Sequence, residues 1–224
     1  MVKHGNDKYQ ILSLILVFLF SFLVSQTTAT IEATDDFYSS RDGGVNSAYP
    51  TNNYATDSII YAGHRESGNW TMRSFFYFDL TGVSGLQDAT LKLWVRGTGS
   101  TSDEYYLHYI TNNWSENINW NTQPTYETTN FQSFSGVGSS SMQISVDLTG
   151  ICDWWVNGII PNYGFVIERY ATGDHYLEIW TRESSGGEPY ITINADSVLE
   201  GYPLMLLVPS FTLLACLLYY RKKN

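Results

Sequence analysis

Alternating apolar and polar residues in the middle of the chain predict β-strands, most clearly over residues 89–96. One face of this segment holds the apolar residues Ala89, Leu91, Leu93 and Val95. The opposite face holds Thr90, Lys92, Trp94 and Arg96. Because successive side chains of a strand point to opposite sides of the sheet, we expect the first set in the core and the second set facing outward.

Residues 73–80 show a second strand pattern. The predicted core face holds Phe76, Phe78 and Leu80, and the predicted outer face holds Arg73, Phe75, Tyr77 and Asp79. Six further short segments rich in Tyr, Phe, Trp, Val and Ile are predicted strands: 58–62, 104–110, 142–148, 164–170, 176–181 and 190–194. Clusters of Gly, Asn, Asp and Ser separate them, which is typical of an all-β fold. We therefore predict an all-β, antiparallel sandwich or barrel.

Residues 148–158 depart from the strand pattern, since the apolar positions 148, 151, 152, 155 and 156 have helical spacing. Thr149 is a plausible N-cap and Gly158 a plausible stop. The segment predicts one short helix that caps an end of the sandwich.

The N-terminal segment resembles a secretory signal. An uncharged apolar run at 11–24 follows Lys3 and Lys8 and precedes a small polar stretch. We expect residues 1–29 to be a signal peptide, with an uncleaved N-terminal anchor as the alternative.

The C-terminal segment 203–220 carries no charge. As a helix it would be about 27 Å long, close to the roughly 30 Å hydrocarbon core of a bilayer. The basic residues that follow favour a cytoplasmic tail at 221–224. The chain is thereby expected to cross the cell membrane once, with an extracellular domain at 31–196. Replacement of the tail by a lipid anchor is the alternative.

Charge bears on the partners of this domain. Residues 31–196 contain 20 acidic and 7 basic residues, a net formal charge of −13. Nucleic-acid binding is not expected, because phosphate recognition requires a basic surface. Cys216 lies in the apolar tail, so Cys152 is expected to be a small buried apolar residue rather than half of a disulfide.

Several short motifs occur in a characteristic order between residues 33 and 194. They are Asp36-Phe37-Tyr38, Pro50-Thr51-Asn52-Asn53-Tyr54, the segments 73–80 and 89–93, Trp114-Ser115-Glu116 with Trp120-Asn121 and Pro124, Val146-Asp147-Leu148-Thr149, Trp155-Val156-Asn157-Gly158, and Asn162-Tyr163-Gly164-Phe165. This order resembles the DNRLRE domains of bacterial and archaeal surface proteins, which overlap carbohydrate-binding module family 96. The resemblance implies a jelly-roll-like sandwich and polysaccharide binding. Some family members bind anionic glycans, whereas this domain is itself acidic, which argues against a uronic-acid ligand.

Two outward-facing sets are candidates for a binding face. The first is Lys92, Trp94 and Arg96, joined by Arg73 and Tyr77 if the two strands pair. The second is Tyr176, Glu178, Trp180 and Arg182. An aromatic ring can stack on a sugar, and flanking charged groups can bond its hydroxyl or carboxylate groups. Alternatively, loops cover these faces, or they are solvated surface, or Arg73 pairs with Glu183.

Residues 114–124 place Trp114 and Trp120 in an otherwise polar stretch. We expect the aromatic side chains to hold this loop against the core while the polar side chains form turns. Stacking of either tryptophan on a sugar is the alternative.

Metal binding and catalysis have weaker sequence support. Structural calcium is the alternative to a metal-free domain. The domain holds the oxygen donors Asp35, Asp36, Asp42, Asn46 and Asp147, which are of the type that calcium prefers, and no EF-hand spacing occurs. His64, His108 and His175 are not part of a recognised catalytic motif, so we predict no catalytic residues.

The sequence thus favours a membrane-anchored cell-surface module that binds polysaccharide. A structural or adhesive envelope protein without glycan binding is the alternative. A polysaccharide-degrading enzyme is a further alternative. Such enzymes use two carboxylates at a defined separation, and a sequence does not show which carboxylates lie close together in space.

Overall fold

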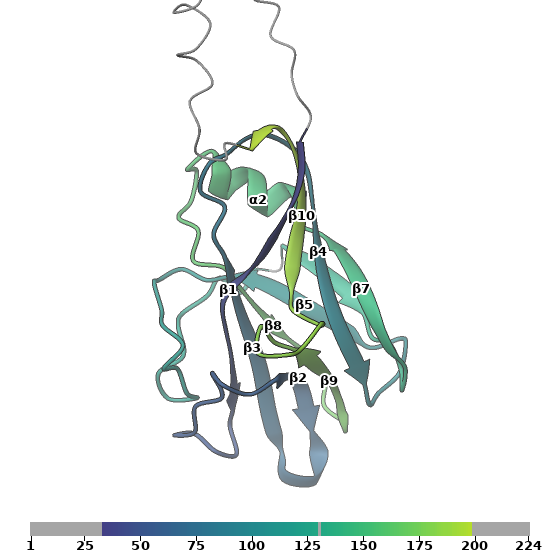
Figure 1. Cartoon of the computed structure of the whole chain (residues 1–224). Coiled ribbons are helices and arrows are strands. Elements are labelled where there is room, and N and C mark those ends of the chain that lie inside the picture. Colours follow the sequence, from purple (N-terminus) through teal and green to yellow (C-terminus); the bar gives the residue numbers. More distant parts are fainter. Residues whose placement is uncertain (1–32, 130, 199–224) are drawn as a thin grey trace, which may run out of the picture. The chain divides into compact units, whose positions relative to one another are not determined.

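Ten β-strands and one α-helix occupy the described part of the computed structural model, residues 33–129 and 131–198 (Figure 1). The strands are β1 (Ala33–Asn46), β2 (Ile59–Arg65), β3 (Trp70–Phe78), β4 (Val83–Gly97), β5 (Glu104–Tyr109), β6 (Gln132–Ser135), β7 (Ser141–Asp147), β8 (Phe165–Glu168), β9 (His175–Trp180) and β10 (Tyr190–Val198). The α-helix is α2 (Thr149–Val156), and a short 3-10 turn spans Glu66–Gly68.

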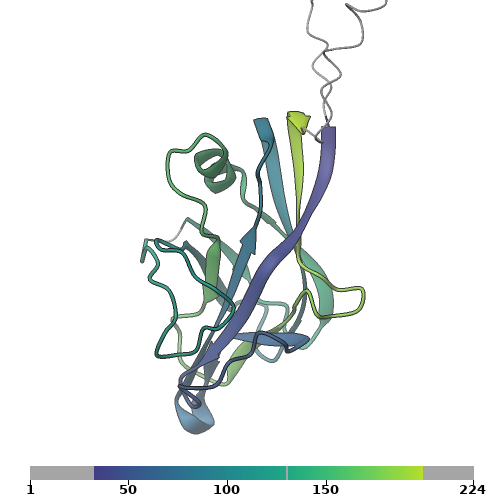
Figure 2. The same cartoon turned by 60° about the vertical axis from the view of Figure 1, so that its left-hand side comes forward.

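All strand pairings are antiparallel, and the strands follow the order β1-β10-β4-β9-β2-β3-β8-β5-β6, with β7 on β4. An additional pairing of β1 with β3 returns the order to its start. The strands therefore form one barrel-like sheet. Strand β1 takes part in this closure over its whole length, with β10 along its first half and β3 along its second (Figure 2). The predicted antiparallel all-β fold with one short helix is confirmed.

The periodicity of β4 predicts its two faces correctly. Ala89, Leu91, Leu93 and Val95 have no exposed surface. They pack with Phe76, Phe78, Ile191 and Ile193 in the main core. Each of the eight predicted strand segments overlaps an observed strand, whereas β1 and β6 were not predicted.

The outer face of β3 differs from the prediction, because Phe75 is completely buried. A second, smaller core forms on this face, where Phe75 packs with Trp114 at a ring distance of 6.0 Å. The Trp114 indole nitrogen donates a hydrogen bond to the Tyr163 carbonyl oxygen at 2.8 Å. Ile118 is also buried, so the loop around residues 114–118 covers the sheet here. The prediction that Trp114 is a packing residue is confirmed.

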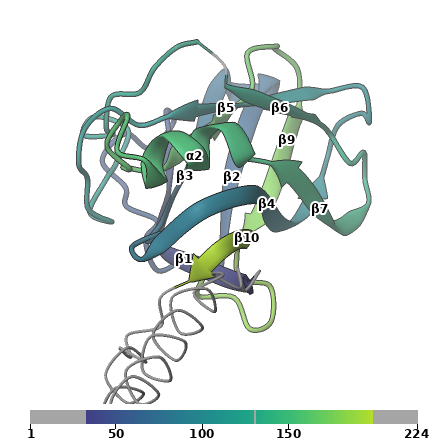
Figure 3. The same cartoon turned by 90° about the horizontal axis from the view of Figure 1, so that it is seen from above.

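Helix α2 lies over one end of the barrel-like sheet (Figure 3). Ile151, Cys152 and Trp155 are its buried residues, and Cys152 is a free cysteine as predicted. The predicted N-cap is wrong by one residue, since Leu148 is the N-cap and Thr149 is already helical. Gly158 adopts a φ of 66°, which lies in the left-handed region that favours glycine at a helix end.

The expected signal peptide at 1–29, membrane helix at 203–220 and tail at 221–224 lie outside the described residues. Within the described part of the chain, α2 is too short and no helix is apolar and long enough to span a bilayer.

Candidate functional site

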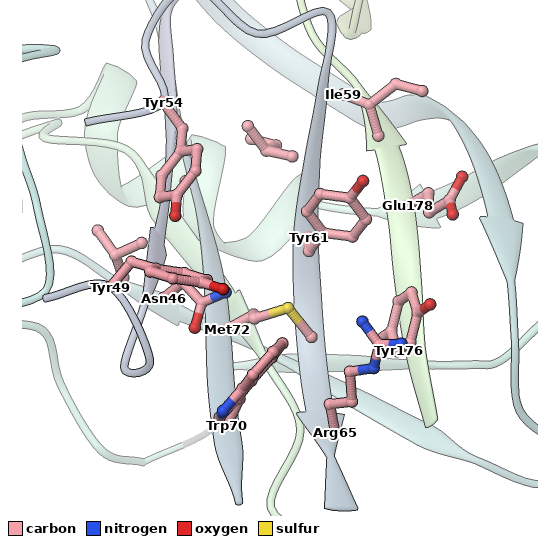
Figure 4. Close-up of a pocket in the computed structure, with 13 residues that line it drawn as sticks. Asn46, Tyr49, Tyr54, Ile59, Tyr61, Arg65, Trp70, Met72, Tyr176 and Glu178 are labelled. Carbon is pink, nitrogen blue, oxygen red and sulfur yellow. The ribbon is translucent and has the colours of Figure 1, made fainter. Parts of the chain in front are cut away.

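A pocket with a volume of about 390 Å³ opens on the surface formed by β1, β2, β3 and β9 (Figure 4). Its size falls within the range of roughly 300–1,000 Å³ that is common for small-molecule sites. Five aromatic side chains line it: Tyr49, Tyr54, Tyr61, Trp70 and Tyr176. Asn46, Arg65 and Glu178 are among the polar lining residues. The pocket therefore combines aromatic faces with a few polar groups.

The register of β2 with its two neighbours brings these side chains together. Strand β2 pairs with β9 so that Tyr61 lies opposite Glu178. It pairs with β3 so that Arg65 lies opposite Trp70. Between these positions, Gly63 lies opposite both Met72 and Tyr176. Residues far apart in the sequence thus line one surface.

Gly63 is required at the centre of this arrangement. Its φ of 134° is a conformation that side-chain-bearing residues rarely adopt. A Cβ atom there would lie 2.5 Å from the backbone oxygen of His175. Glycine therefore allows β9 to approach β2 closely and fixes the position of Tyr176 beside Tyr61.

Two edge-on aromatic pairs stand on either side of Met72 (Figure 4). Tyr49 and Trp70 form one pair, with ring centroids 5.8 Å apart and an interplanar angle of 61°. Tyr61 and Tyr176 form the other, at 5.8 Å and 67°. Edge-on packing of this kind fixes ring orientation. The two pairs therefore form two walls of the pocket.

The charged groups of the pocket differ in how they are neutralised. Glu178 is only 8% exposed, and its carboxylate lies 2.5 Å from the guanidinium of Arg96. The Arg65 guanidinium carbon lies 5.5 Å from the centre of the Trp70 ring and makes no ion pair within residues 33–129 and 131–198. Burial, and then the negative charge of Glu178, raise the pKa of Tyr61. Its phenol is protonated at neutral pH, as a tyrosine with the ordinary pKa of 10 also is, and can donate a hydrogen bond.

The structure brings together residues from both predicted binding sets. Arg96 lies opposite Glu178, which places the outer face of β4 next to that of β9. Trp94 is 38% exposed, as predicted for an outward residue. Lys92 also faces outward and donates a hydrogen bond to the Ser145 hydroxyl at 2.8 Å. Trp180 lies on β9 and is partly covered, because the backbone at Gly187 packs closely against its ring.

Arg73 and Tyr77 do not belong to this surface, because β3 does not pair with β4. The Arg73 guanidinium donates a hydrogen bond to Glu168 at 2.7 Å and lies 4.7 Å from the Trp120 ring. Its ion-pair partner is thus Glu168, and the suggested pairing with Glu183 is wrong. The Tyr77 ring lies 4.1 Å from the guanidinium carbon of Arg41. Both side chains are engaged within the second core region.

The guanidinium of Arg182 also has several partners within the domain. It pairs with Glu116 at 2.9 Å and with Glu183 at 2.8 Å. It further donates a hydrogen bond to the Ser40 carbonyl oxygen at 3.0 Å. Arg182 therefore connects β1, the loop at 114–124 and the segment after β9, and it does not line the pocket.

The acidic residues considered for calcium are dispersed. Asp36 on β1 and Asp147 on β7 are separated by β10 and β4. The Asp42 carboxylate accepts a hydrogen bond from the backbone nitrogen of Arg182 at 2.9 Å. In the described part of the chain, no cluster of three or more His, Cys, Asp or Glu side chains is arranged to hold a metal ion.

Comparison with known proteins identifies related sequences. The model of carbohydrate-binding module family 96 matches residues 28–195. The tRNA3(Ser)-specific nuclease WapA of Bacillus spizizenii is 24% identical over an alignment of 187 residues, and the match covers 73% of this chain and 8% of that protein. The chain thus corresponds to a small part of the nuclease.

Proposed function

Because the chain belongs to carbohydrate-binding module family 96, we propose that its aromatic pocket binds a sugar ring of a polysaccharide. The observation that carries this assignment is the set of five aromatic side chains around one opening of about 390 Å³. Rings such as Tyr61 and Trp70 offer apolar faces to the C–H groups of a sugar. Arg65, Asn46 and the tyrosine hydroxyls offer hydrogen bonds to its polar groups.

The family assignment describes a binding module, and we propose no catalytic activity for this chain. The similarity to a nuclease extends over 8% of that protein. The acidic composition of residues 31–196 also supports a glycan over a nucleic acid as the partner, since phosphate recognition requires basic residues.

Glycan-array screening of the full-length protein, with its variants, tests this proposal. Tyr61→Ala and Trp70→Ala each remove one aromatic wall of the pocket, and we expect each to weaken binding about tenfold or more. Trp154→Ala is the matched control, because Trp154 is a 44% exposed aromatic residue on α2, outside the pocket. It should bind like the unmodified protein.

Two results would oppose glycan binding in the pocket. One is full binding by both pocket variants. The other is the absence of any glycan ligand for a correctly folded protein, which would favour a structural or adhesive role in the cell envelope.

We also propose that the domain is displayed at the cell surface, with residues 203–220 in the membrane. The uncharged apolar sequence of this segment and the basic residues after it support this location.

A further inference from the structure

The outer face of β4 continues directly from the pocket. Tyr61 and Glu178 line the pocket, and Glu178 lies opposite Arg96 on β4. Arg96, Trp94 and Lys92 follow one another on the outer face of this strand, since the alternate residues Leu93 and Val95 are buried. The pocket and the outer face of β4 are therefore parts of one surface.

Aromatic residues also mark the far end of this surface. Lys92 lies opposite Tyr190 of β10, and Tyr190 lies opposite Tyr38 of β1. The two tyrosine rings are 5.5 Å apart, and Tyr38 is 55% exposed. We call the outward side chains of Arg96, Trp94, Lys92, Tyr190 and Tyr38 the β4 ridge.

The dimensions of the surface exceed those of a single sugar. From Tyr61 to Arg96 there are two strand spacings, roughly 10 Å, and from Arg96 to Lys92 there are four residues along a strand, roughly 13 Å. One sugar ring in the pocket cannot reach Trp94 or Tyr190. A chain of several linked sugars can reach both.

The chemistry of the ridge suits the same ligand as the pocket. Trp94 and Tyr38 present exposed aromatic surface, as the pocket residues do. Where the pocket meets the β4 ridge, Arg96 neutralises the negative charge of Glu178 through an ion pair. In addition, Gln143 of β7 donates a hydrogen bond to the Tyr190 hydroxyl at 3.4 Å, which orients that ring. The ridge thus combines the cationic side chains of Arg96 and Lys92 with the aromatic side chains of Trp94, Tyr190 and Tyr38.

Different residues line the two sides of the pocket. Tyr54, Tyr49 and Trp70 stand along the side toward β1 and β3, whereas Tyr176 and Glu178 stand along β9 (Figure 4). A chain that enters from the β9 side meets the Tyr49–Trp70 pair as a wall. We propose that the pocket holds a terminal sugar of a linear polysaccharide and that the following sugars lie along the β4 ridge. This inference rests on the proposed function, because the chain must first occupy the pocket.

Binding of oligosaccharides of increasing length to the full-length protein tests the proposal. The probes are cello-oligosaccharides, manno-oligosaccharides and oligouronates of one to six sugar units, measured by calorimetry. We expect affinity to increase with length in the series that binds. Trp94→Ala and Tyr38→Ala should weaken binding of the six-unit probe about threefold to tenfold and leave the one- and two-unit probes unchanged. Tyr61→Ala should weaken all lengths.

A further pair of probes tests which part of the chain enters the pocket. Attachment of a bulky fluorophore at either end of the six-unit oligosaccharide should block binding at one end and be tolerated at the other. Trp154→Ala again serves as the control for an exposed aromatic residue elsewhere. Thermal melting of each variant verifies that it is folded.

The outcomes separate the two proposals. If affinity does not depend on length, or if Trp94→Ala and Tyr38→Ala bind all probes like the unmodified protein, the ridge proposal is wrong while sugar binding in the pocket stands. Tolerance of the fluorophore at both ends would overturn terminal recognition. If no probe binds and the pocket variants show no loss on the array, both proposals fail.

Discussion

Asp42 is a buried carboxyl group whose two oxygens have unequal environments. Asp42 is only 1% exposed, and one of its carboxyl oxygens accepts a hydrogen bond from the backbone nitrogen of Arg182. The other, Oδ1, has no hydrogen-bond partner within the described residues. Burial raises the pKa of Asp42 to about 7, and the negative charges of Glu183 and Glu116 act in the same direction. The folded protein therefore favours the protonated acid.

The raised pKa predicts a pH-dependent stability. The folded-state value of about 7 exceeds the ordinary value of 3.8, so the stabilising contribution is complete below pH 3.8 and is lost as the pH rises through 7. Asp42→Asn removes this titration. Between pH 5 and pH 8, the free energy of unfolding of the unmodified protein should fall by about 2–3 kcal/mol relative to that of this variant. Urea unfolding at both pH values measures the difference, and an equal difference at the two pH values would contradict the raised pKa.

The loop at residues 114–124 shows how an element without regular structure can be part of the core. Trp114 is 6% exposed, contacts Phe75 and donates to Tyr163. Trp114→Ala should lower the free energy of unfolding by about 3–5 kcal/mol, through lost packing and the cavity that remains. Chemical denaturation measures the loss. Trp154→Ala, at an exposed position of α2, is the control and should change the free energy of unfolding by no more than about 0.5 kcal/mol. An equally small effect of Trp114→Ala would show that this side chain does not hold the loop.

Strands with strict alternation could be predicted from the sequence, and irregular ones could not. In β4, Leu91, Leu93 and Val95 alternate with polar residues because only one face is buried. In β1, Gly43 and Gly44 interrupt any alternation, and the burial of this strand depends on contacts with β3. Phe75 was assigned to the wrong environment, because strand periodicity does not reveal that a distant loop covers a sheet face.

The candidate site was predicted only in the part that lies on alternating strands. Trp94, Arg96 and Glu178 were found from the two-residue periodicity of β4 and β9. The pocket itself was not found, because Tyr49 belongs to a loop and Trp70 to a different strand. Tyr61 lies between the buried residues Ile60 and Ala62, so the alternation of β2 indicates that Tyr61 faces outward. Its meeting with the other rings depends on the order of strands in the closed sheet.

Closure of the sheet determines the surface of the whole molecule. The first strand, β1, pairs with the last strand, β10, and also with β3. Ala33 lies opposite Ala195, so the described chain begins and ends on neighbouring strands. The described domain therefore begins and ends at the same end of this strand pair. Attachment through the proposed anchor at this end would leave the pocket surface on β2, β3 and β9 free.

This arrangement gives a prediction for the location of the protein. Deletion of residues 203–224 should release the protein from the membrane fraction of the cell, because the uncharged segment and its basic flank are the proposed anchor. Fractionation after an alkaline wash measures the release, and N-terminal sequencing of the product tests removal of residues 1–29. External protease should cut the domain from intact cells that carry the full chain. Retention of the shortened protein with an intact N-terminus would instead assign the anchor to residues 1–29, and recovery of the full chain in the soluble fraction would contradict membrane attachment altogether.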